Sequence, residues 1–275
     1  MRMDPCFQAF MRDYVNIDKS RLENLGRSVE AIYGALLADP VLGPLILDKD
    51  PQGSWAQRTI IKPVNGREFD ADFMLILTEN PDWSENPARY VDELHAALSR
   101  HGIYKSMVKP PKCRCARVVY AGDYHIDVVP FLVLAGGRQV IVNREENKWE
   151  DTNPQGLTAW FAEKDAVTRD HLREVIRLVK YLRDHGGNFL RTRSVLLTAM
   201  LGEQVDAAKV TADPGYYEDL PTTFYHVISD LNDWLEDNRT KPSIVDPSGA
   251  CDPQGNPVTF DHRWEEATTR TSAPR

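Results

Sequence analysis

Cysteine is scarce in this sequence, and basic residues do not outnumber acidic ones. The four cysteines are scattered along 275 residues, and Cys113 and Cys115 lack a second pair at the spacing of a zinc site. Reduced thiols are the better interpretation, so we expect a cytoplasmic protein. The formal net charge of −8 argues against a protein that coats long nucleic acid, because phosphate binding needs a basic surface. A small, locally basic pocket for nucleotides remains compatible with that charge.

Long apolar runs are also lacking. No stretch approaches the roughly 18 consecutive apolar residues that a membrane helix needs, so no membrane partner is expected. The first residues, MRMDPCFQAFMRDY, carry acidic side chains early and have no long apolar centre, so they do not predict a signal peptide. The composition, with 42% hydrophobic and 27% charged residues, is typical of a soluble globular fold with one large domain or two lobes.

Helices are predicted where apolar residues recur every three or four positions. The clearest has Asp18 as its N-cap and Asp39-Pro40 as its stop. A second clear helix ends at Gly186-Gly187. The expected helices cover Lys19–Ala38, Tyr90–Arg100, Asp170–His185, Ser194–Leu201 and Thr222–Leu235.

Strands are predicted where side chains alternate or run apolar, and Ala121-Gly122-Asp123 supplies the turn chemistry of a hairpin. Residues Asn143–Pro154 are polar and predict a loop. The expected strands cover Thr59–Ile61, Glu68–Leu77, Ala116–Tyr120 and His125–Leu134.

The order of these elements predicts an α+β fold in two parts. Residues 1–145 would hold the long N-terminal helix and a twisted mixed sheet, and residues 146–275 a helical lobe with a closing tail rich in Pro, Gly and Asp. We expect the active site in the cleft between the two lobes.

Two aspartates in the strand Glu68–Leu77 raise a question of charge. Because side chains two residues apart on a strand face the same side, Asp70 and Asp72 would point together into solvent or a cleft. Carboxylates that close raise each other's pKa unless a cation neutralises them. Asp127, on a strand that could lie beside the first, would face outward with His125 and complete the set. Three such aspartates could hold two Mg²⁺ ions about 4 Å apart, the geometry of phosphoryl transfer.

Gly53-Ser54 precedes this pair and predicts a phosphate-binding turn. Glycine lets the backbone come close, and the N–H groups of a short helix would point at the β- and γ-phosphates of a nucleotide. A single D-x-D or a single Gly-Ser is common and mostly structural. The order Gly-Ser, then D-x-D about sixteen residues later, then a third strand aspartate is much more specific.

With these motifs in place, the chain resembles the nucleotidyltransferases of the DNA polymerase β type. It is most similar to the cGAS/DncV-like nucleotidyltransferases (CD-NTases), bacterial relatives of cyclic GMP-AMP synthase and oligoadenylate synthase. The resemblance covers nearly the whole chain and rests on Gly53-Ser54, Thr59-Ile60-Ile61, Asp70-Ala71-Asp72 and Asp127.

The resemblance implies an enzyme that condenses nucleoside triphosphates (ATP, GTP, UTP or CTP) into a cyclic di- or oligonucleotide and releases pyrophosphate. It implies two Mg²⁺ ions, with Mn²⁺ able to substitute, held by Asp70, Asp72 and Asp127. It also implies a role in bacterial anti-phage signalling (CBASS), in which a separate effector protein reads the product.

Two residues of the helical half carry over by the same resemblance. RLVKYLRD (177–184) is similar to the family helix whose lysine reaches the triphosphate, which indicates Lys180, although a solvated helix lysine is an equal alternative. RTRSVLLTAML (191–201) is similar to the helix start whose serine touches the same phosphates, which indicates Ser194. Taken alone, Ser194 is expected to be an N-cap.

Two alternatives keep the same aspartates. The acceptor could be an antibiotic, a protein side chain or a tRNA end, although the acidic net charge weighs against a tRNA. The chain could also be an inactive member that only senses nucleotides, although all three carboxylates are present.

Overall fold

The computed structural model describes residues 3–64, 66, 68–187, 189 and 192–264. They form two compact units whose segments alternate along the chain. The sheet unit comprises Ile17–Ala56 and Gly66–Asn153, and the helical unit comprises Met1–Asn16, Gln57–Asn65 and Pro154–Arg275. The division at residues 145 and 146 stays a prediction about domains.

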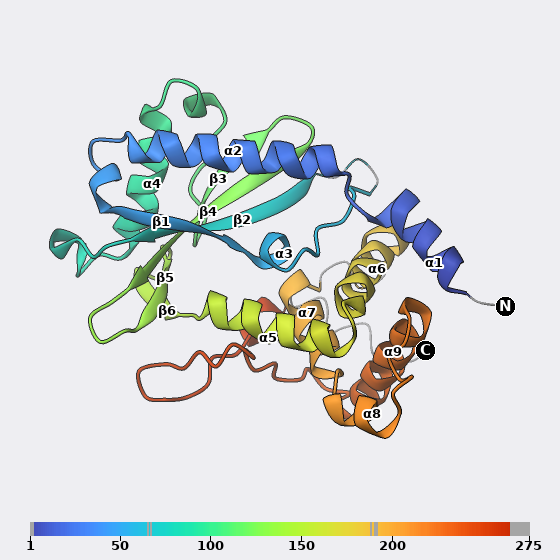
Figure 1. Ribbon diagram of the computed structural model, residues 1–275. Coiled ribbons are helices and arrows are strands. Elements are labelled where there is room, and N and C mark those ends of the chain that lie inside the picture. The colour runs from blue at the N-terminus through green and yellow to red at the C-terminus, as the bar shows by residue number, and fades with distance from the viewer. Residues whose placement is uncertain (1–2, 65, 67, 188, 190–191, 265–275) are drawn as a thin grey trace. The chain divides into compact units, whose positions relative to one another are not determined.

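The sheet unit is built on one mixed sheet (Figure 1). Among the described residues its strands are β1 Ile46–Gln52, β2 Phe69–Leu77, β3 Ala116–Tyr120, β4 Tyr124–Val133, β5 Gln139–Asn143 and β6 Lys148–Asp151. Their spatial order is β1-β2-β4-β5-β6, and β3 lies against β4. Strands β2 and β4 are parallel, and the other neighbouring pairs are antiparallel. The predicted hairpin between β3 and β4 is confirmed.

One face of this sheet is apolar because β2 alternates as predicted. Its buried residues on that face are Phe69, Ala71, Phe73, Leu75 and Leu77. Helices α2 (Lys19–Leu37) and α4 (Ala88–Arg100) pack against each other, and α4 also packs against β4. The Ser28 and Tyr124 hydroxyls share a hydrogen bond of 2.8 Å, which fixes α2 to β4.

The predicted start of α2 is confirmed. The Asp18 side chain accepts a hydrogen bond of 2.9 Å from the backbone N–H of Arg21, and thus caps the helix. The carboxylate of Asp39 accepts bonds from the N–H groups of Val41 and Leu42 where the helix has ended. Arg100 at the end of α4 binds the same carboxylate, at 2.7 and 2.9 Å.

Two expectations about the strands were wrong, and strands β1 and β5 were missed. Thr59–Ile61 is no strand: Ile61 forms only an isolated bridge with Asn16. The expected loop over Asn143–Pro154 contains β6, a short polar edge strand. Strand β1 was missed because it contains a proline and three charged residues, a pattern that an edge strand tolerates and a propensity argument rejects.

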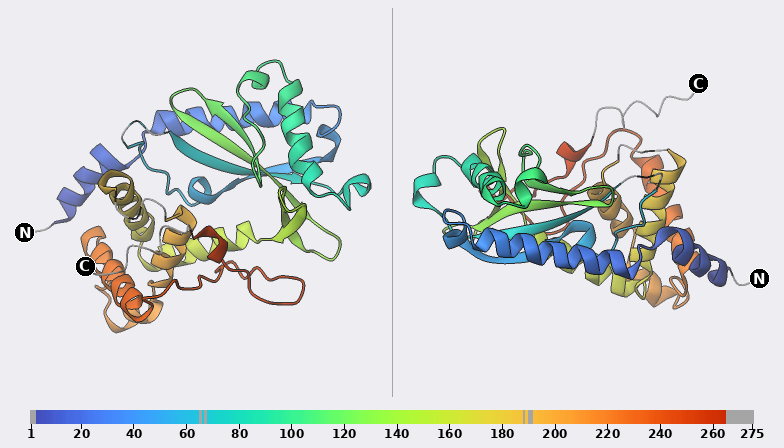
Figure 2. Two further views of the ribbon diagram at one scale, coloured as in Figure 1. Left: turned by 180° about the vertical axis from the view of Figure 1, so that it is seen from behind. Right: turned by 90° about the horizontal axis from the view of Figure 1, so that it is seen from above.

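The helical unit has its own apolar core. Figure 2 shows the helices of this unit from two further sides. Its helices are α1 Asp4–Phe10, α5 Pro154–Val167, α6 His171–Gly186, α7 Ser194–Glu203, α8 Ala207–Ala212 and α9 Leu220–Asp237. Helix α6 packs against α5, α7 and α9. It ends at Gly186, which confirms the predicted stop at Gly186-Gly187, and Gly187 caps it in the left-handed conformation with a φ of +72°. In the described part of the chain, no helix has the length and apolar character needed to cross a membrane.

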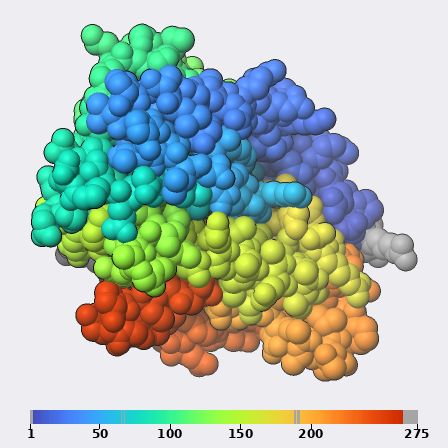
Figure 3. Space-filling view, turned by 60° about the vertical axis from the view of Figure 1, so that its left-hand side comes forward, coloured from blue at the N-terminus to red at the C-terminus, as the bar shows by residue number. Residues whose placement is uncertain are grey.

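The described part of the closing tail, residues 241–264, packs onto these helices. Figure 3 shows it (red) beside the yellow-green of α5. The indole N–H of Trp264 donates to the Pro242 carbonyl at 3.1 Å. A pocket of about 440 Å³ lies under the tail, lined among others by Trp160, Trp234 and Ile244.

Candidate active site

The two predicted carboxylate strands are direct neighbours in the sheet. In the parallel pairing of β2 and β4, Asp72 lies opposite Asp127, and Asp70 lies opposite His125. Paired residues of neighbouring strands face the same side, and residues two apart share that side. The structure therefore brings Asp70, Asp72 and Asp127 onto one face, the one opposite the apolar face of β2. We call it the aspartate face.

Arg117 of β3 binds both carboxylate oxygens of Asp127. Arg117 is the antiparallel partner of Asp127 in the sheet. Its Nε donates to Oδ1 of Asp127 and a terminal NH₂ group donates to Oδ2, both at 2.6 Å. Lys112 lies farther away, with its Nζ 3.8 Å from Oδ2. Burial would raise the pKa of Asp127, but the hydrogen bonds and charge of Arg117 hold that pKa below its usual value.

Asp72 lies in a strongly negative environment. Its burial is the largest cause of a raised pKa, and the neighbouring charges of Asp70 and Asp127 add to it. Arg117 and Lys112 counteract the shift only in part, and the pKa of Asp72 is raised to about 8. A carboxylate kept under such repulsion is stabilised by any cation that binds beside it.

His125 shares the aspartate face but is held by its surroundings. Its Nδ1 lies 3.5 Å from a carboxylate oxygen of Glu68. Burial lowers the pKa of His125, and the nearby charge of Arg117 lowers it further. A neutral imidazole is therefore expected at neutral pH, a state in which it balances none of the charge of the aspartates.

Gly53 and Ser54 open a short helix, α3 (Gly53–Ala56), directly after β1, as predicted. Gly53 has a φ of +57°, a conformation that favours glycine. A Cβ built at this position would lie 3.5 Å from Oδ2 of Asp72. The backbone of the predicted phosphate-binding turn thus lies next to the aspartate face, within the same unit.

The three carboxylates fit a divalent metal by their chemistry, because Mg²⁺ and Mn²⁺ prefer anionic oxygen ligands. The mutual repulsion that raises the pKa of Asp72 points the same way. Within the described ranges, however, no three Asp, Glu, His or Cys side chains are gathered closely enough to hold a metal ion. The predicted site is therefore not preformed: both oxygens of Asp127 are occupied by Arg117.

Lys180, predicted on the helical half, is neither solvated nor at the surface. Only 4% of this α6 residue is exposed. Its Nζ donates to the Thr59 carbonyl at 3.1 Å and to the Thr59 hydroxyl at 2.9 Å. The alternative of a solvated helix lysine is wrong, because the side chain is buried and its ammonium group donates to Thr59, a residue of the same unit.

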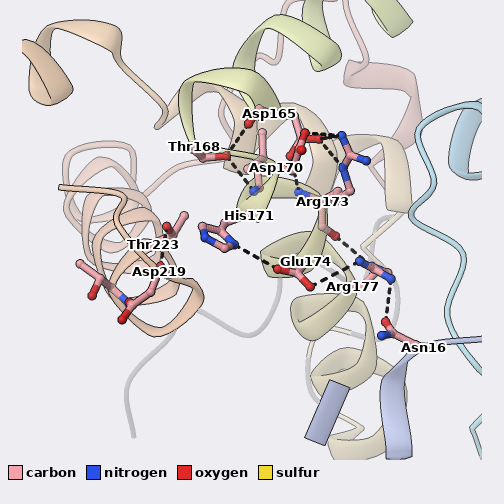
Figure 4. A network of polar contacts seen from close by, with 12 residues as sticks. Asn16, Asp165, Thr168, Asp170, His171, Arg173, Glu174, Arg177, Asp219 and Thr223 are labelled. Atoms are coloured by element: carbon pink, nitrogen blue, oxygen red, sulfur yellow. Dashed lines mark hydrogen bonds and ion pairs between the residues drawn. The ribbon is translucent and has the colours of Figure 1, made fainter. Parts of the chain in front are cut away.

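A network of ion pairs anchors the first half of α6 (Figure 4). Asp165, fully buried at the end of α5, accepts from the backbone N–H of Arg173 at 2.9 Å and forms an ion pair with its guanidinium. One turn later, Arg177 donates to the side chain of Asn16 at 2.6 Å. Lys180 follows on the next turn, so the network positions it.

Ser194 is the first residue of α7 and not its N-cap. The cap position is held by Arg193, and Ser194 lies one residue inside the helix. The hydroxyl oxygen of Ser194 accepts a hydrogen bond of 3.2 Å from Arg183. Arg183 also donates to the Thr192 carbonyl at 3.0 Å, so it ties α6 to the start of α7.

Sequence reasoning missed Arg117. A signal for it was present: Arg117 and Asp127 each lie five residues from Gly122, the centre of the predicted turn. A hairpin with that centre pairs the two residues, as the structure does.

Comparisons with known proteins show which proteins this chain is similar to. A family model described as the Second Messenger Oligonucleotide or Dinucleotide Synthetase domain (SMODS) matches residues 1–165. A c-di-GMP synthase of Roseivirga ehrenbergii is 31% identical over 160 residues, which make up 56% of this chain and 41% of that protein. The chain thus matches well under half the length of this relative.

Solved structures share the fold over most of the chain. The CD-NTase CdnG of Bradyrhizobium diazoefficiens, in complex with GTP, has a TM-score of 0.73 and 18% identity, and the match covers 97% of this chain and 85% of that one. The cyclic AMP-GMP synthase DncV of Vibrio cholerae, described as a prokaryotic cGAS homologue, has a TM-score of 0.65 and 16% identity, covering 81% and 76%. The predicted α+β class is confirmed, and the fold is one that the CD-NTase CdnG and DncV share.

Proposed function

Because the chain belongs to the family of the Second Messenger Oligonucleotide or Dinucleotide Synthetase domain, we propose that it condenses nucleoside triphosphates into a cyclic di- or oligonucleotide. The resemblance to the CD-NTases that the sequence indicated is confirmed. The observation that carries the proposal is the pairing of Asp72 with Asp127 in register, with Asp70 on the same face.

The proposed reaction is a nucleotidyl transfer. A ribose hydroxyl of one nucleotide attacks the α-phosphate of another, so that a new P–O bond forms and the bond between the α- and β-phosphates breaks. The hydroxyl proton is lost and pyrophosphate leaves. A second transfer within the linear intermediate closes the ring. GTP is the first substrate to test, because a relative is named a c-di-GMP synthase.

Asp70, Asp72 and Asp127 would hold the two divalent ions, Mg²⁺ or Mn²⁺. Ions bound there supply a lowered pKa for the attacking hydroxyl and charge stabilisation for the leaving pyrophosphate. The carboxylates themselves supply negative charge on a fixed sheet face, and the strands fix their spacing. Their raised electrostatic energy without a cation favours ion binding.

Four further residues would bind the triphosphate. Gly53 and Ser54 would contact the phosphates with backbone N–H groups and a hydroxyl, beside Asp72. By the family resemblance, Lys180 and Ser194 would add contacts to the same phosphates. Lys180 would then exchange its present bonds with Thr59 for charge-assisted bonds to phosphate oxygens.

The cellular role follows from the resemblance alone. The product would be a second messenger in cytoplasmic anti-phage signalling, read by a separate effector protein. Long nucleic acid and membranes are not part of this proposal.

The test is incubation of the protein with labelled ATP, GTP, UTP and CTP, singly and together, with Mg²⁺ or Mn²⁺. Phosphatase treatment follows, and then chromatography. A labelled product that resists phosphatase supports the proposal, because cyclic phosphodiesters have no terminal phosphate. Label on an added acceptor would indicate the alternative transferase. Nucleotide binding without any labelled product would indicate an inactive sensor.

A further inference from the structure

The bidentate pair of Arg117 and Asp127 has a consequence for ion binding. Both carboxylate oxygens accept from the guanidinium at 2.6 Å, and the Asp127 side chain is 11% exposed. A carboxylate whose two oxygens both accept from one guanidinium has one lone pair of each oxygen occupied and its charge balanced, so it is a weaker ligand for a metal ion. Divalent ions must therefore compete with Arg117 for Asp127.

We propose that Arg117 is a positioning residue that holds Asp127 away from the metal site and so weakens the binding of a divalent ion without nucleotide. The inference rests on the proposed function, because it takes Asp70, Asp72 and Asp127 as the metal ligands.

The balance of charge determines whether Arg117 favours the free ion or the ion bound to a nucleotide. In the absence of ligand, Arg117 and Lys112 partly neutralise the three aspartates. An ion that binds alone displaces the guanidinium of Arg117 from Asp127. The guanidinium is then half-buried without an anionic partner, which costs free energy. An ion that arrives with a nucleotide brings phosphate oxygens, which are suitable acceptors for the released guanidinium. Arg117 thereby favours the metal–nucleotide complex over the free ion.

A second pair in the same sheet has the same geometry without the same surroundings. Arg138, the residue before β5, donates to the two carboxylate oxygens of Asp151, the last residue of β6, at 2.6 and 2.9 Å. Asp151 is not one of the aspartates of the metal site. Arg138→Gln therefore removes an equivalent ion pair from the sheet and is the matched control.

The experiment measures Mn²⁺ binding by electron paramagnetic resonance in the absence of nucleotide. It compares the full chain with the variants Arg117→Gln, Arg117→Lys, Arg138→Gln and Asp127→Asn. It is run at about pH 8.5, where protons compete less with the ion for the carboxylates. Melting temperatures confirm that each variant is folded.

We expect Arg117→Gln to bind Mn²⁺ about tenfold more tightly, since a charge-assisted competitor has been removed. The Mn²⁺ affinity of Arg117→Lys should lie between those of the wild type and Arg117→Gln, because lysine keeps the charge but cannot donate two parallel hydrogen bonds to the carboxylate. Arg138→Gln should match the wild type, and Asp127→Asn should bind weakly. A purely structural role for Arg117 predicts the opposite sign, since its loss would disturb Asp127 and weaken binding.

Unchanged or weaker Mn²⁺ binding by Arg117→Gln, with Asp127→Asn impaired, overturns this inference and leaves the metal site intact. If Asp127→Asn binds as well as the wild type, the metal site itself is wrong, and the proposed function falls with the inference. Should Arg117→Gln not fold, the Arg117→Lys variant decides: affinity equal to or below the wild type overturns the inference.

Discussion

Helix α6 and the aspartate face differ in how completely their charged side chains are paired. Along α6, Arg173 is paired with the buried Asp165, Arg177 binds Asn16, and Lys180 binds Thr59. On the aspartate face, three carboxylates share the charge of Arg117 and Lys112, and the pKa of Asp72 is raised.

The difference distinguishes charged residues that stabilise the fold from charged residues that bind a ligand. Charged side chains that each have a hydrogen-bond partner, as on α6, fix a helix in place, and removing a partner leaves a charged group unsatisfied. A surplus of one sign costs stability and is retained where a ligand of the opposite sign binds. The unmatched carboxylates, and not the larger network of α6, therefore mark the candidate active site.

The largest expected effect tests the aspartate face. Asp70→Asn with Asp72→Asn should lower synthesis by about a thousandfold or more, because the metal ligands are lost while the fold is kept. Asp48→Asn, an exposed residue of β1, is the control and should retain activity. Product formation and circular dichroism provide the two readouts. Substantial synthesis by the double variant would exclude these residues as metal ligands.

On α6 the same type of substitution should weaken the fold. Asp165→Asn should lower the free energy of unfolding by about 3 kcal/mol, since it removes the partner of a partly buried guanidinium. Asp170 binds the same Arg173 but is 73% exposed, so Asp170→Asn should cost under about 0.5 kcal/mol. Urea unfolding measures both. Equal losses for the two variants would contradict the claim that burial sets the energy of this network.

Lys180 tests whether a buried charged residue of α6 only stabilises the fold or also binds the nucleotide. Lys180→Met should raise the apparent KM for nucleotide about tenfold, since a charge-assisted contact is worth about 1.5–3 kcal/mol. Lys164→Met is the control: Lys164 likewise donates to a backbone carbonyl, that of Val205, at 2.8 Å. Both variants should lose some stability, but only Lys180→Met should affect KM. If KM is unchanged, Lys180 is purely structural.

The smallest effect is a gain of stability that depends on pH. The pKa of Asp72 is raised in the folded protein, so the folded state binds more protons than the unfolded state between pH 3.8 and about pH 8. The contribution of Asp72 to stability therefore falls as the pH rises through this window. Asp72→Asn removes this pH-dependent loss of stability. Above about pH 8 the free energy of unfolding of the variant should therefore exceed that of the wild type by about 1 kcal/mol.

The measurement is urea unfolding at about pH 5 and about pH 8.5 in the presence of a chelator. The variant and the wild type should differ little at the lower pH, where Asp72 is protonated and uncharged. A variant that is less stable than the wild type at the higher pH would show that Asp72 is stabilised by its neighbours, contrary to the repulsion argued above.

Much of the sheet unit could be predicted because its signals are local. Asp18 was identified as a cap, β2 from its alternation, and the hairpin from Gly122. Strand β1 could not be, since Pro51 and its charged residues are compatible with a strand only at a sheet edge. Ser194 was misjudged by one position, because a serine at a helix start is compatible with either position.

By itself the sequence determined that Asp70 and Asp72 share a face, because the two-residue period of a strand is a property of adjacent residues. It also determined the family, since a family model matches residues 1–165, and the hairpin centred on Gly122 pairs Arg117 with Asp127. Tertiary structure alone decided that Lys180 is buried against Thr59, which is 121 positions away. A contact of this kind depends on how distant segments pack, so no local pattern predicts it.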